Sequence, residues 1–555
     1  MNKMNIIRLK GTVITYFEER KIGWIKDENQ VDRMFHLGSV SDHIIMRRGT
    51  EVVFTPAISN KKKPIAIGIV PIKDKKIGIN QSNIDILQTI NNTWFLEAKN
   101  EDILKLFYYI DEYDQLNLTN KCIVIGRKGT GKTALAEFLY SQKSDDCFSE
   151  RLNFKDFPFN ELYSKIDPKY TFQNQYITIW KFIIYGSLLK MMSLNEKICI
   201  PLLKVLRKIF PIDPIDTLYR KFEHMTKFSL SLEILGSTIG TGVMPMKDDR
   251  ELTWIEQVDL FENIICNYID DSKYMIILDA LDADYNNLLS EEKRNIYFSL
   301  LTSLLKAVQE IKSIFPILKY KFQPIVFLRD DIYKEIKDSD MTKWQDSSIV
   351  LHWDKEKIKK MLAHRISKTL NTQSDLFFEE AWAKLFDFKY VTTMFGKHEC
   401  FDTICRYTFM RPRDFIQFVK ICCGNALHSR QGQITQSIFT GSLLSYSQWM
   451  RSEIESEIKE VIPDIEEIMK IISNIRKVEF RLKEFVDNYK ASLVKGKIKN
   501  ETDPETIFEI LYQFNVVGNR TRGQTINFYL SNPQSSFNPK ESIIIHKGLL
   551  KSFGV

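Results

Sequence analysis

No two cysteines of this sequence are spaced as C-x-x-C, although the chain contains eight of them. This absence removes the usual signatures of a zinc ribbon and of a small scaffold held by disulfides. His398, Cys400 and Cys405 lie near one another, but a fourth metal ligand at a recognisable spacing is lacking. We therefore expect ordinary semi-buried side chains there, in a protein whose cysteines are reduced.

Long hydrophobic runs are also scarce. The most apolar stretch, residues 179–192, is interrupted by Lys181 and Lys190 and is shorter than the roughly 20 residues that a membrane span needs. The first residues run directly into a strand-like segment, without a charged and then apolar leader. We therefore expect a buried helix at 179–192 and a cytoplasmic protein that does not associate with a membrane.

Positive charge exceeds negative charge only slightly, with a formal net charge of +7 over 555 residues. That balance permits nucleic-acid binding without arguing for it. The sequence also lacks a recognisable nuclease, protease or deaminase arrangement, so a toxic output would require a separate effector protein. What remains is an ordinary composition, with 44% hydrophobic and 27% charged residues, in a chain long enough for several domains.

Short strand-like segments dominate residues 1–72. They lie at 11–17, 23–26, 33–36 and 51–55. So many short strands within this length predict a small antiparallel barrel. The polar stretch that follows, 73–95, is expected to be a linker.

From residue 96 to residue 352, helices alternate with apolar strands. The strand predicted at 121–125 ends at a glycine-rich segment, and those at 274–279 and 324–329 each end in a charged residue. Such apolar strands are typical of a parallel sheet covered by helices on both faces. The long interval between the first two strands predicts a helical insertion at about 143–270.

The last third of the chain is predicted to be mostly helical. Residues 353–450 are expected to form a helical lid over the preceding α/β region. Residues 451–555 begin with helices and end with short strands, an order that loosely fits a winged-helix-like module.

The glycine-rich segment at 126–133 reads G-R-K-G-T-G-K-T. Its glycines let the backbone wrap closely around phosphates, and its N–H groups, with the start of the next helix, point at the anion. Lys132 is expected to reach the β- and γ-phosphates, and Thr133 to offer a hydroxyl to Mg²⁺. The pattern therefore predicts a site for ATP or GTP with Mg²⁺, formed by Gly126, Gly129, Thr130, Gly131, Lys132, Thr133 and Ala134.

Acidic residues end the second predicted strand. Asp279 is expected to hold Mg²⁺ together with Thr133, the alternative being an acid that caps the next turn. Asp282 and Asp284 follow on the same loop, and of the two we expect Asp282 to polarise the attacking water. A glutamate does not directly follow Asp279, which leaves the rate of hydrolysis open.

Arginines occupy two further positions of interest. Arg329 ends the third apolar strand, where it would face the γ-phosphate from the carboxyl edge of the sheet; the alternative is a solvated pair with the two aspartates that follow. Arg411 and Arg413 open a predicted lid helix, an unfavourable place for unpaired cations. We expect them to contact phosphates, within one chain or across a subunit boundary. The expected catalytic residues are Lys132, Asp279, Asp282, Arg329 and Arg413.

These segments together resemble a group of bacterial AAA-like or STAND-like P-loop ATPases, many of them associated with anti-phage defence loci. The resemblance rests on residues 126–134, 277–282, 328–331 and 411–414, in that order. It implies ATP as the nucleotide and a helical lid followed by a winged-helix tail. We also expect a homo-oligomer, in which Arg329 or Arg413 would complete a neighbour's site.

The first 72 residues resemble a cold-shock domain, a nucleic-acid-binding barrel of the OB type. The resemblance rests on residues 11–17, 21–27, 32–36 and 49–54. In that family aromatic side chains on neighbouring strands stack on bases while basic ones follow the backbone. The matching positions are Tyr16, Trp24 and His36, with Phe17 and Lys26 nearby, while Ile22 and Met34 replace aromatic residues.

The sequence thus predicts a multidomain fold: an OB/cold-shock-like barrel, an α/β P-loop NTPase with a helical insertion, a helical lid and a winged-helix-like module. We expect a Mg²⁺-dependent ATPase coupled to single-stranded RNA or DNA, acting as a sensor in anti-phage defence. Two alternatives stay open. One is a nucleotide switch that docks partner proteins, and the other is a transcription regulator that reads duplex DNA through the tail.

Overall fold

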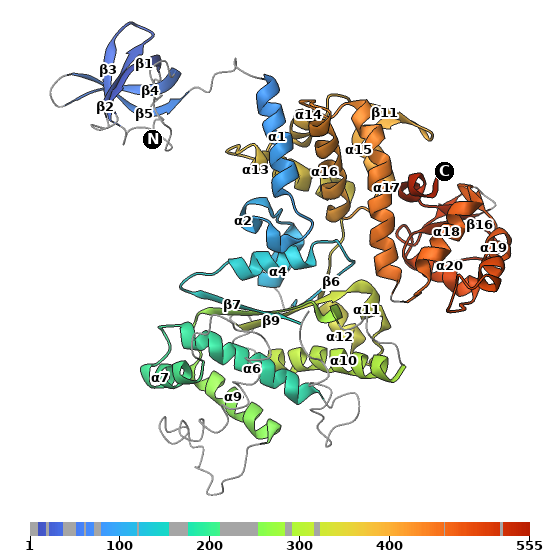
Figure 1. Ribbon diagram of the computed structural model, residues 1–555. Coiled ribbons are helices and arrows are strands. Elements are labelled where there is room, and N and C mark those ends of the chain that lie inside the picture. Colours follow the sequence, from blue (N-terminus) through green and yellow to red (C-terminus); the bar gives the residue numbers. More distant parts are fainter. Residues whose placement is uncertain are drawn as a thin grey trace, which may run out of the picture. The chain divides into compact units, whose positions relative to one another are not determined.

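The computed structural model describes residues 9–17, 22–36, 51–59, 63–71, 79–118, 121–154, 176–210, 253–283, 291–315, 322–459, 461–521 and 525–555. Contacts divide the chain into two compact units, residues 1–82 and residues 83–555. Figure 1 labels the elements of both units. The predicted α/β region, lid and C-terminal module all fall in the second unit.

The first unit is a small closed barrel, as predicted. Its strands pair in the order β1-β2-β3-β5-β4, and every neighbouring pair except β3 with β5 is antiparallel. Val13, Ile25, Phe35 and Phe54 are among the buried residues of its core. The strands are β1 (Leu9–Phe17), β2 (Ile22–Asp27), β3 (Asp32–His36), β4 (Glu51–Ile58) and β5 (Pro64–Pro71).

The second unit is built on a five-stranded sheet with the order β10-β6-β9-β8-β7, in which all pairs are parallel. The carboxyl ends of all strands therefore meet at one edge, where ligands of open α/β sheets bind. The α/β region predicted from the sequence is confirmed. The strands are β6 (Ile123–Gly126), β7 (Cys147–Asn153), β8 (Lys273–Asp279), β9 (Phe322–Arg329) and β10 (Ser348–Val350).

Helices cover both faces of this sheet (Figure 1). The residues of β6 alternate between two cores: Val124 packs in the core that includes α4 and the lid, and Ile125 in the core on the opposite face. This alternation explains why the central strands are apolar on both sides. On one face lies α4 (Lys132–Ser141), and on the other lie α6 (Ile177–Leu194), α9 (Trp254–Tyr268) and α10 (Glu291–Ile314).

Helix α6 is the one helix in the described ranges that is long and apolar enough to cross a membrane. However, 83% of this stretch is buried inside the fold. Its neighbours are α9, α10 and α7 (Ile200–Ile209). The helix is therefore placed as a core helix, in agreement with the sequence expectation.

Two segments differ from the sequence expectations. Strand β7 lies inside the stretch predicted as a helical insertion and forms the edge of the sheet; its charged residues Glu150 and Arg151 conceal its strand character. Helix α1 (Ile79–Thr93) lies in the predicted linker. Its Leu87 and Ile90 are fully buried against the second unit's core, because apolar residues recur on one face of an otherwise polar helix.

The lid is helical and packs on the α4 side of the sheet. Its antiparallel helices α16 (Pro412–His428) and α17 (Gln436–Ile458) lie side by side (Figure 1). Helix α17 runs past the predicted boundary at residue 450 without interruption. The other elements are α13 (Lys355–Thr369), α14 (Phe378–Leu385), α15 (Cys400–Tyr407) and the hairpin of β11 (Tyr390–Thr393) with β12 (Gly396–Glu399).

The C-terminal module combines three helices with a four-stranded antiparallel sheet of order β13-β16-β14-β15. The last residues return to α17, where the backbone N–H of Ser552 donates to Ser447 Oγ at 2.9 Å. The elements are α18 (Ile465–Ile475), β13 (Glu479–Phe480), α19 (Leu482–Val494), α20 (Pro504–Gln513), β14 (Val517–Arg520), β15 (Ile526–Asn527) and β16 (Ser542–Ile545).

The docking of α1 gives a test of the fold. Leu87→Ala is expected to lower the free energy of unfolding of the second unit by about 2–5 kcal/mol, because it removes a fully buried side chain. Gln88→Ala, an exposed neighbour on the same helix, serves as the control. Thermal unfolding followed by tryptophan fluorescence measures both, and equal melting temperatures for the two variants would show that α1 is not part of this core.

Candidate functional site

The P-loop joins β6 to α4 at the carboxyl edge of the sheet. Gly129 and Gly131 have φ angles of 83° and 96°, which a residue with a side chain rarely adopts. The ammonium of Lys132 lies in the hollow of the loop, donating to the carbonyls of Gly126 at 2.8 Å and Arg127 at 3.1 Å. The loop therefore surrounds the ammonium of Lys132, a residue that also lines the cavity.

Burial makes Lys132 an unusual lysine. Desolvation lowers its pKa to about 8, against the opposing attraction of Asp282 and Asp279, while Arg329 adds to the lowering. A phosphate placed beside the ammonium would supply the negative charge that the hollow lacks. The charged form of Lys132 is thus stabilised by binding an anion.

Not every predicted P-loop residue faces the cavity. Gly129, Gly131, Lys132, Thr133 and Ala134 line it, whereas Gly126 and Thr130 do not. Instead, the hydroxyl of Thr130 donates to the carbonyl of Arg127 at 2.8 Å, and its own carbonyl accepts from an indole N–H, that of Trp353, at 2.9 Å. Thr130 therefore stabilises the shape of the loop, and its contact with a nucleotide stays a prediction.

The strand-end residues predicted as catalytic meet at the same cavity. Asp279, Asp282 and Arg329 all line it together with Lys132. Arg329 Nη1 lies 3.6 Å from Asp282 Oδ2, and the same guanidinium donates to both oxygens of Asp331, at 3.1 and 2.6 Å. Arg329 thus faces the cavity while it is paired with a following aspartate, and its role at the γ-phosphate stays a prediction.

Arg151 on β7 is a site residue that the sequence did not indicate. Its Nη2 donates to Asp279 Oδ2 at 2.5 Å, and its Nη1 donates to Glu137 on α4. The three side chains are mostly buried. Arg151 therefore fixes the carboxylate of Asp279 from the neighbouring strand, a position that only the pairing of β7 with β8 reveals.

The donors present suit Mg²⁺. Thr133 and Asp279 both line the cavity and offer a hydroxyl and a carboxylate, oxygen ligands of the kind Mg²⁺ takes. Within the described ranges there is no group of three or more His, Cys, Asp or Glu side chains that could hold a metal ion. A Mg²⁺ ion here would thus be held by one or two protein oxygens and by phosphates, as is usual for this ion.

The other end of the cavity is apolar and aromatic. This cavity of about 220 Å³ continues from the P-loop to walls formed by η2 (Ala98–Asn100), α2 (Ile103–Leu106) and the residues around them. The sequence interpretation missed these walls, although the cluster of aromatic residues just before the P-loop strand was a usable signal. The apolar wall residues are Phe95, Leu96, Ile103, Leu106, Phe107, Tyr108, Met361 and Ile416.

A buried ion pair supports this apolar end. Arg365 of α13 pairs with Glu101, whose Oε1 also accepts from the backbone N–H of Phe95 at 2.8 Å. The guanidinium of Arg365 lies over the Trp94 ring, 4.7 Å from its centroid. The pair ties the wall segment to the lid helix, so the lid and the base end of the cavity are held together.

The start of α16 rests directly on the P-loop. The backbone N–H of Arg413 donates to the carbonyl of Gly129 at 3.4 Å, and the Arg413 side chain lines the cavity. A Cβ at Gly129 would lie 3.2 Å from Arg413 Cβ, so the close approach also depends on this glycine. The structure therefore brings Arg413 to the site, where the sequence placed it.

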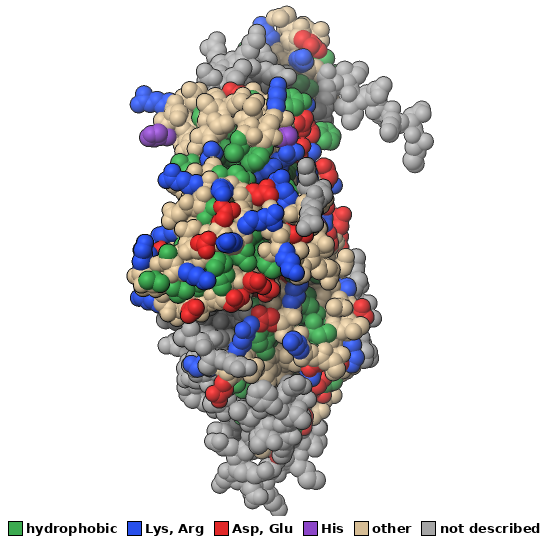
Figure 2. Space-filling view, turned by 90° about the vertical axis from the view of Figure 1, so that its right-hand side faces the viewer, with side chains coloured by type: hydrophobic (Ala, Val, Ile, Leu, Met, Phe, Trp, Pro, Cys, Tyr) green, Lys and Arg blue, Asp and Glu red, His purple; other side chains and the backbone are tan. Residues whose placement is uncertain are grey.

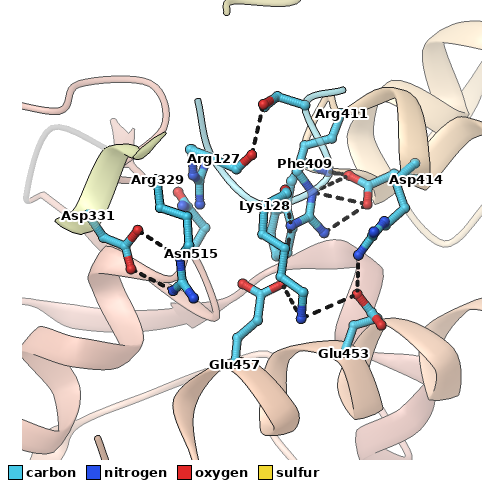
Figure 3. A network of polar contacts seen from close by, with 12 residues as sticks. Arg127, Lys128, Arg329, Asp331, Phe409, Arg411, Asp414, Glu453, Glu457 and Asn515 are labelled. Carbon is cyan, nitrogen blue, oxygen red and sulfur yellow. Dashed lines mark hydrogen bonds and ion pairs between the residues drawn. The ribbon is translucent and has the colours of Figure 1, made fainter. Parts of the chain in front are cut away.

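Arg411 is not placed as the sequence predicted. Its guanidinium is buried and holds both oxygens of Asp414, and its Nη1 donates to the backbone carbonyl of Lys128 at 3.1 Å (Figure 3). It does not line the cavity with Arg413. Arg411 thus binds the loop from outside the cavity, because Asp414, one turn further along α16, holds its guanidinium there.

The barrel residues predicted to contact nucleic acid lie on its first three strands. Lys26 and His36 are exposed and Trp24 is half-buried. The register sets Trp24 opposite Met34, and Met34 is 39% exposed. Because inward and outward residues alternate along each strand, the side chains of Trp24, Lys26, Met34 and His36 share the outer face of β2 and β3.

The two remaining predicted barrel residues are Tyr16 and Phe17. Their backbone belongs to β1, where Tyr16 lies opposite Gly23 and Phe17 opposite Ile22. Their side chains lie outside the described residues. Their predicted roles in base stacking therefore stay predictions.

Comparison with known proteins adds three likenesses. The family described as the FunZ-associated C-terminal helical domain matches residues 356–455, which correspond to the lid and most of α17. An Escherichia coli (strain K12) protein named for transposon gamma-delta is 22% identical over 324 residues, covering 54% of this chain and 43% of that protein. The chain thus matches less than half the length of this relative.

The third likeness is to a solved structure. The crystal structure of Cdc6p from Pyrobaculum aerophilum superposes with a TM-score of 0.29 at 12% identity, covering 87% of this chain and 93% of that one. A TM-score of this size does not establish a shared fold. The P-loop assignment therefore rests on the geometry of the loop, the sheet and the cavity in this chain.

The lowered pKa of Lys132 predicts proton uptake on nucleotide binding. Phosphates raise that pKa, so ATP should take up about half a proton at pH 8 and most of a proton at pH 9, and affinity should fall as pH rises above 8. Titration calorimetry in buffers of different ionisation enthalpy measures the uptake. In Lys132→Arg, whose side chain stays protonated, the uptake should vanish; uptake that persists in this variant would contradict the assignment.

The different placements of Arg411 and Arg413 predict different losses. Arg411→Gln should lower the free energy of unfolding by about 3–5 kcal/mol, because it leaves the buried carboxylate of Asp414 without its cation. Arg413→Gln should cost less than about 1 kcal/mol, because its partners are partly exposed. Urea unfolding of both variants decides the matter, and equal losses would show that the two arginines are equivalent.

Proposed function

We propose that this chain is a Mg²⁺-dependent ATPase whose nucleotide state is coupled to single-stranded nucleic acid bound by its N-terminal barrel. The observation that carries the proposal is the gathering of Lys132, Asp279 and Arg329 around one cavity that the P-loop closes. These are the charges that phosphoryl transfer needs: a cation on the phosphates, an acid for Mg²⁺ and a second cation for the charge that develops in the transition state.

Each residue has a separate task in this proposal. Lys132 neutralises the β- and γ-phosphates, and Thr133 and Asp279 supply the protein oxygens for Mg²⁺. Asp282, whose side chain is 38% exposed, lies where water reaches it and orients the attacking water. Arg329 then stabilises the charge on the transferred group. Because no glutamate directly follows Asp279, we propose that turnover is slow.

The apolar end of the cavity supports a nucleoside as the remaining part of the ligand. Aromatic and aliphatic side chains give a flat base the stacking and dispersion contacts that a purely polar phosphate site would lack. We choose ATP on the family resemblance. A ligand that bridges the P-loop and these walls would contact the sheet and the lid together.

The outer face of the barrel supports the nucleic-acid part of the proposal. It presents an aromatic ring, a basic side chain and an imidazole on adjacent strands, the combination that binds single strands by stacking and charge. The E. coli relative is named for a transposon, and a nucleic-acid partner would suit such a setting. The wider proposal is a cytoplasmic oligomeric sensor with a separate effector protein, and its place in anti-phage defence rests on the resemblance alone.

The C-terminal module favours a second candidate function. Strand β13 lies between its first two helices, and the other three strands of its sheet follow α20. Winged-helix modules share this order, and such modules dock either DNA or protein. On the face drawn in Figure 2, basic and acidic side chains of the described residues are intermixed. That face therefore offers no continuous basic surface for duplex DNA, and favours the alternative of a nucleotide switch that docks proteins over that of a duplex reader.

ATP hydrolysis by the full chain with Mg²⁺ tests the proposal, with single-stranded RNA, single-stranded DNA or duplex DNA added in turn. One single-stranded ligand is expected to stimulate turnover, and Lys132→Ala should abolish turnover altogether. Trp24→Ala should weaken binding of that ligand by about 1–3 kcal/mol, the loss of one stacked base.

Two controls accompany this experiment. Ile58→Ala removes an exposed apolar side chain from β4, a strand that pairs with neither β2 nor β3, and should leave the stimulation intact. Trp24→Phe should retain most of it. If turnover depends on Lys132 but responds to no nucleic acid, the coupling is wrong and the protein-docking switch takes its place.

A further inference from the structure

Two cations at the phosphate end of the cavity are held by acids of α17. Lys128 and Arg413 both line the cavity. Lys128 Nζ lies 3.9 Å from Glu453 and 3.6 Å from Glu457, which are one helical turn apart (Figure 3). Arg413 Nη1 lies 3.2 Å from Glu453. The long lid helix therefore supplies countercharges to the cations that a nucleotide would use.

These contacts are incompletely satisfied. Glu457 Oε1 is buried and has no hydrogen-bond partner, although Lys128 and Arg411 lie 3.5–3.6 Å from it. Arg413 Nε is likewise buried without a partner. In a polar network of low local dielectric, each buried atom that lacks a partner costs free energy. An anion of higher charge in the cavity, such as a phosphate, would therefore compete with weakly held ion pairs.

The acids also connect the site to the C-terminal module. Within the two turns before Glu453, α17 contacts the end of the chain: Ser552 donates to Ser447, and Arg451 lies over the Phe553 ring, 5.2 Å from its centroid. Glu457 itself lines a second cavity, of about 320 Å³, together with Gln513, Phe514 and Tyr529 of the module. A displacement of this helix would therefore reach the tail.

We propose that Glu453 and Glu457 are positioning residues that compete with nucleotide phosphates for Lys128 and Arg413, so that nucleotide binding releases the end of α17 and the module it carries. This inference rests on the proposed function and adds the route by which the site reaches the tail. A ligand shifts such an equilibrium only through its different affinity for the two states. Here the affinity differs because the phosphates can pair with Lys128 and Arg413 only in the state in which the two carboxylates no longer do so.

The test is the affinity of the full chain for ATP without turnover, measured by calorimetry with the Mg²⁺ complex of a non-hydrolysable ATP analogue. Glu453→Gln combined with Glu457→Gln should bind the analogue roughly three- to tenfold more tightly, because the two carboxylates no longer compete for Lys128 and Arg413. The matched control is Glu455→Gln. Glu455 lies on the same helix between the two acids but pairs with Arg451 at 2.7 Å. The Glu455→Gln variant should therefore bind the analogue as tightly as the unaltered chain does.

Amide hydrogen exchange supplies the second readout, which a purely local effect on affinity would not change. In the unaltered chain the analogue should raise exchange in residues 451–459 and 547–553. In the double variant exchange there should already be high and respond little. Unchanged or weaker affinity in the double variant, or the same gain in Glu455→Gln, would overturn this inference alone. A chain that binds no nucleotide, with Lys132→Ala indistinguishable from it, would overturn the proposed function as well.

Discussion

The contact between the P-loop and the first turn of α16 is the constraint on which the site depends. Two carbonyls of the loop accept hydrogen bonds from the start of α16: Arg413 N–H donates to Gly129, and Arg411 donates to Lys128. Asp414, fully buried, fixes Arg411 in turn. Because these hydrogen bonds join the loop to the lid, a change in the loop's conformation would also move α16 and the neighbouring α17.

Buried arginine–carboxylate pairs occur at both ends of the cavity. Arg365 with Glu101 ties the apolar walls to α13, and Arg411 with Asp414 ties the P-loop to α16. Burying charges costs free energy that their attraction roughly offsets, so such pairs contribute more to geometry than to net stability. We interpret them as fixed points of the site. The ion pairs of Lys128 with Glu453 and Glu457 of α17 are longer, at 3.9 and 3.6 Å, and these are the contacts that we propose a nucleotide exchanges.

Much of the site was predictable because its chemistry is encoded locally. The P-loop, Asp279 and Arg329 each lie at the end of a buried strand, and parallel strands bring such ends to one edge. The closed barrel followed similarly from its spacing of short strands. Arg411 was misplaced because its partners, Asp414 and a loop carbonyl, compete for a side chain that sequence alone shows only as a cation. Strand β7 and helix α1 were missed because charged and polar residues dilute their apolar patterns.

The sequence by itself determined which residues meet at the P-loop end of the cavity, since its glycines and lysine follow one buried strand directly and its acids end a neighbouring one. Only the tertiary structure decided which side chains surround that end. Arg151 reaches Asp279 through the pairing of β7 with β8, and Glu453 reaches Lys128 through the packing of the lid. Both are contacts between residues far apart in the chain, and their strength depends on burial and on competing charges, which the fold alone creates.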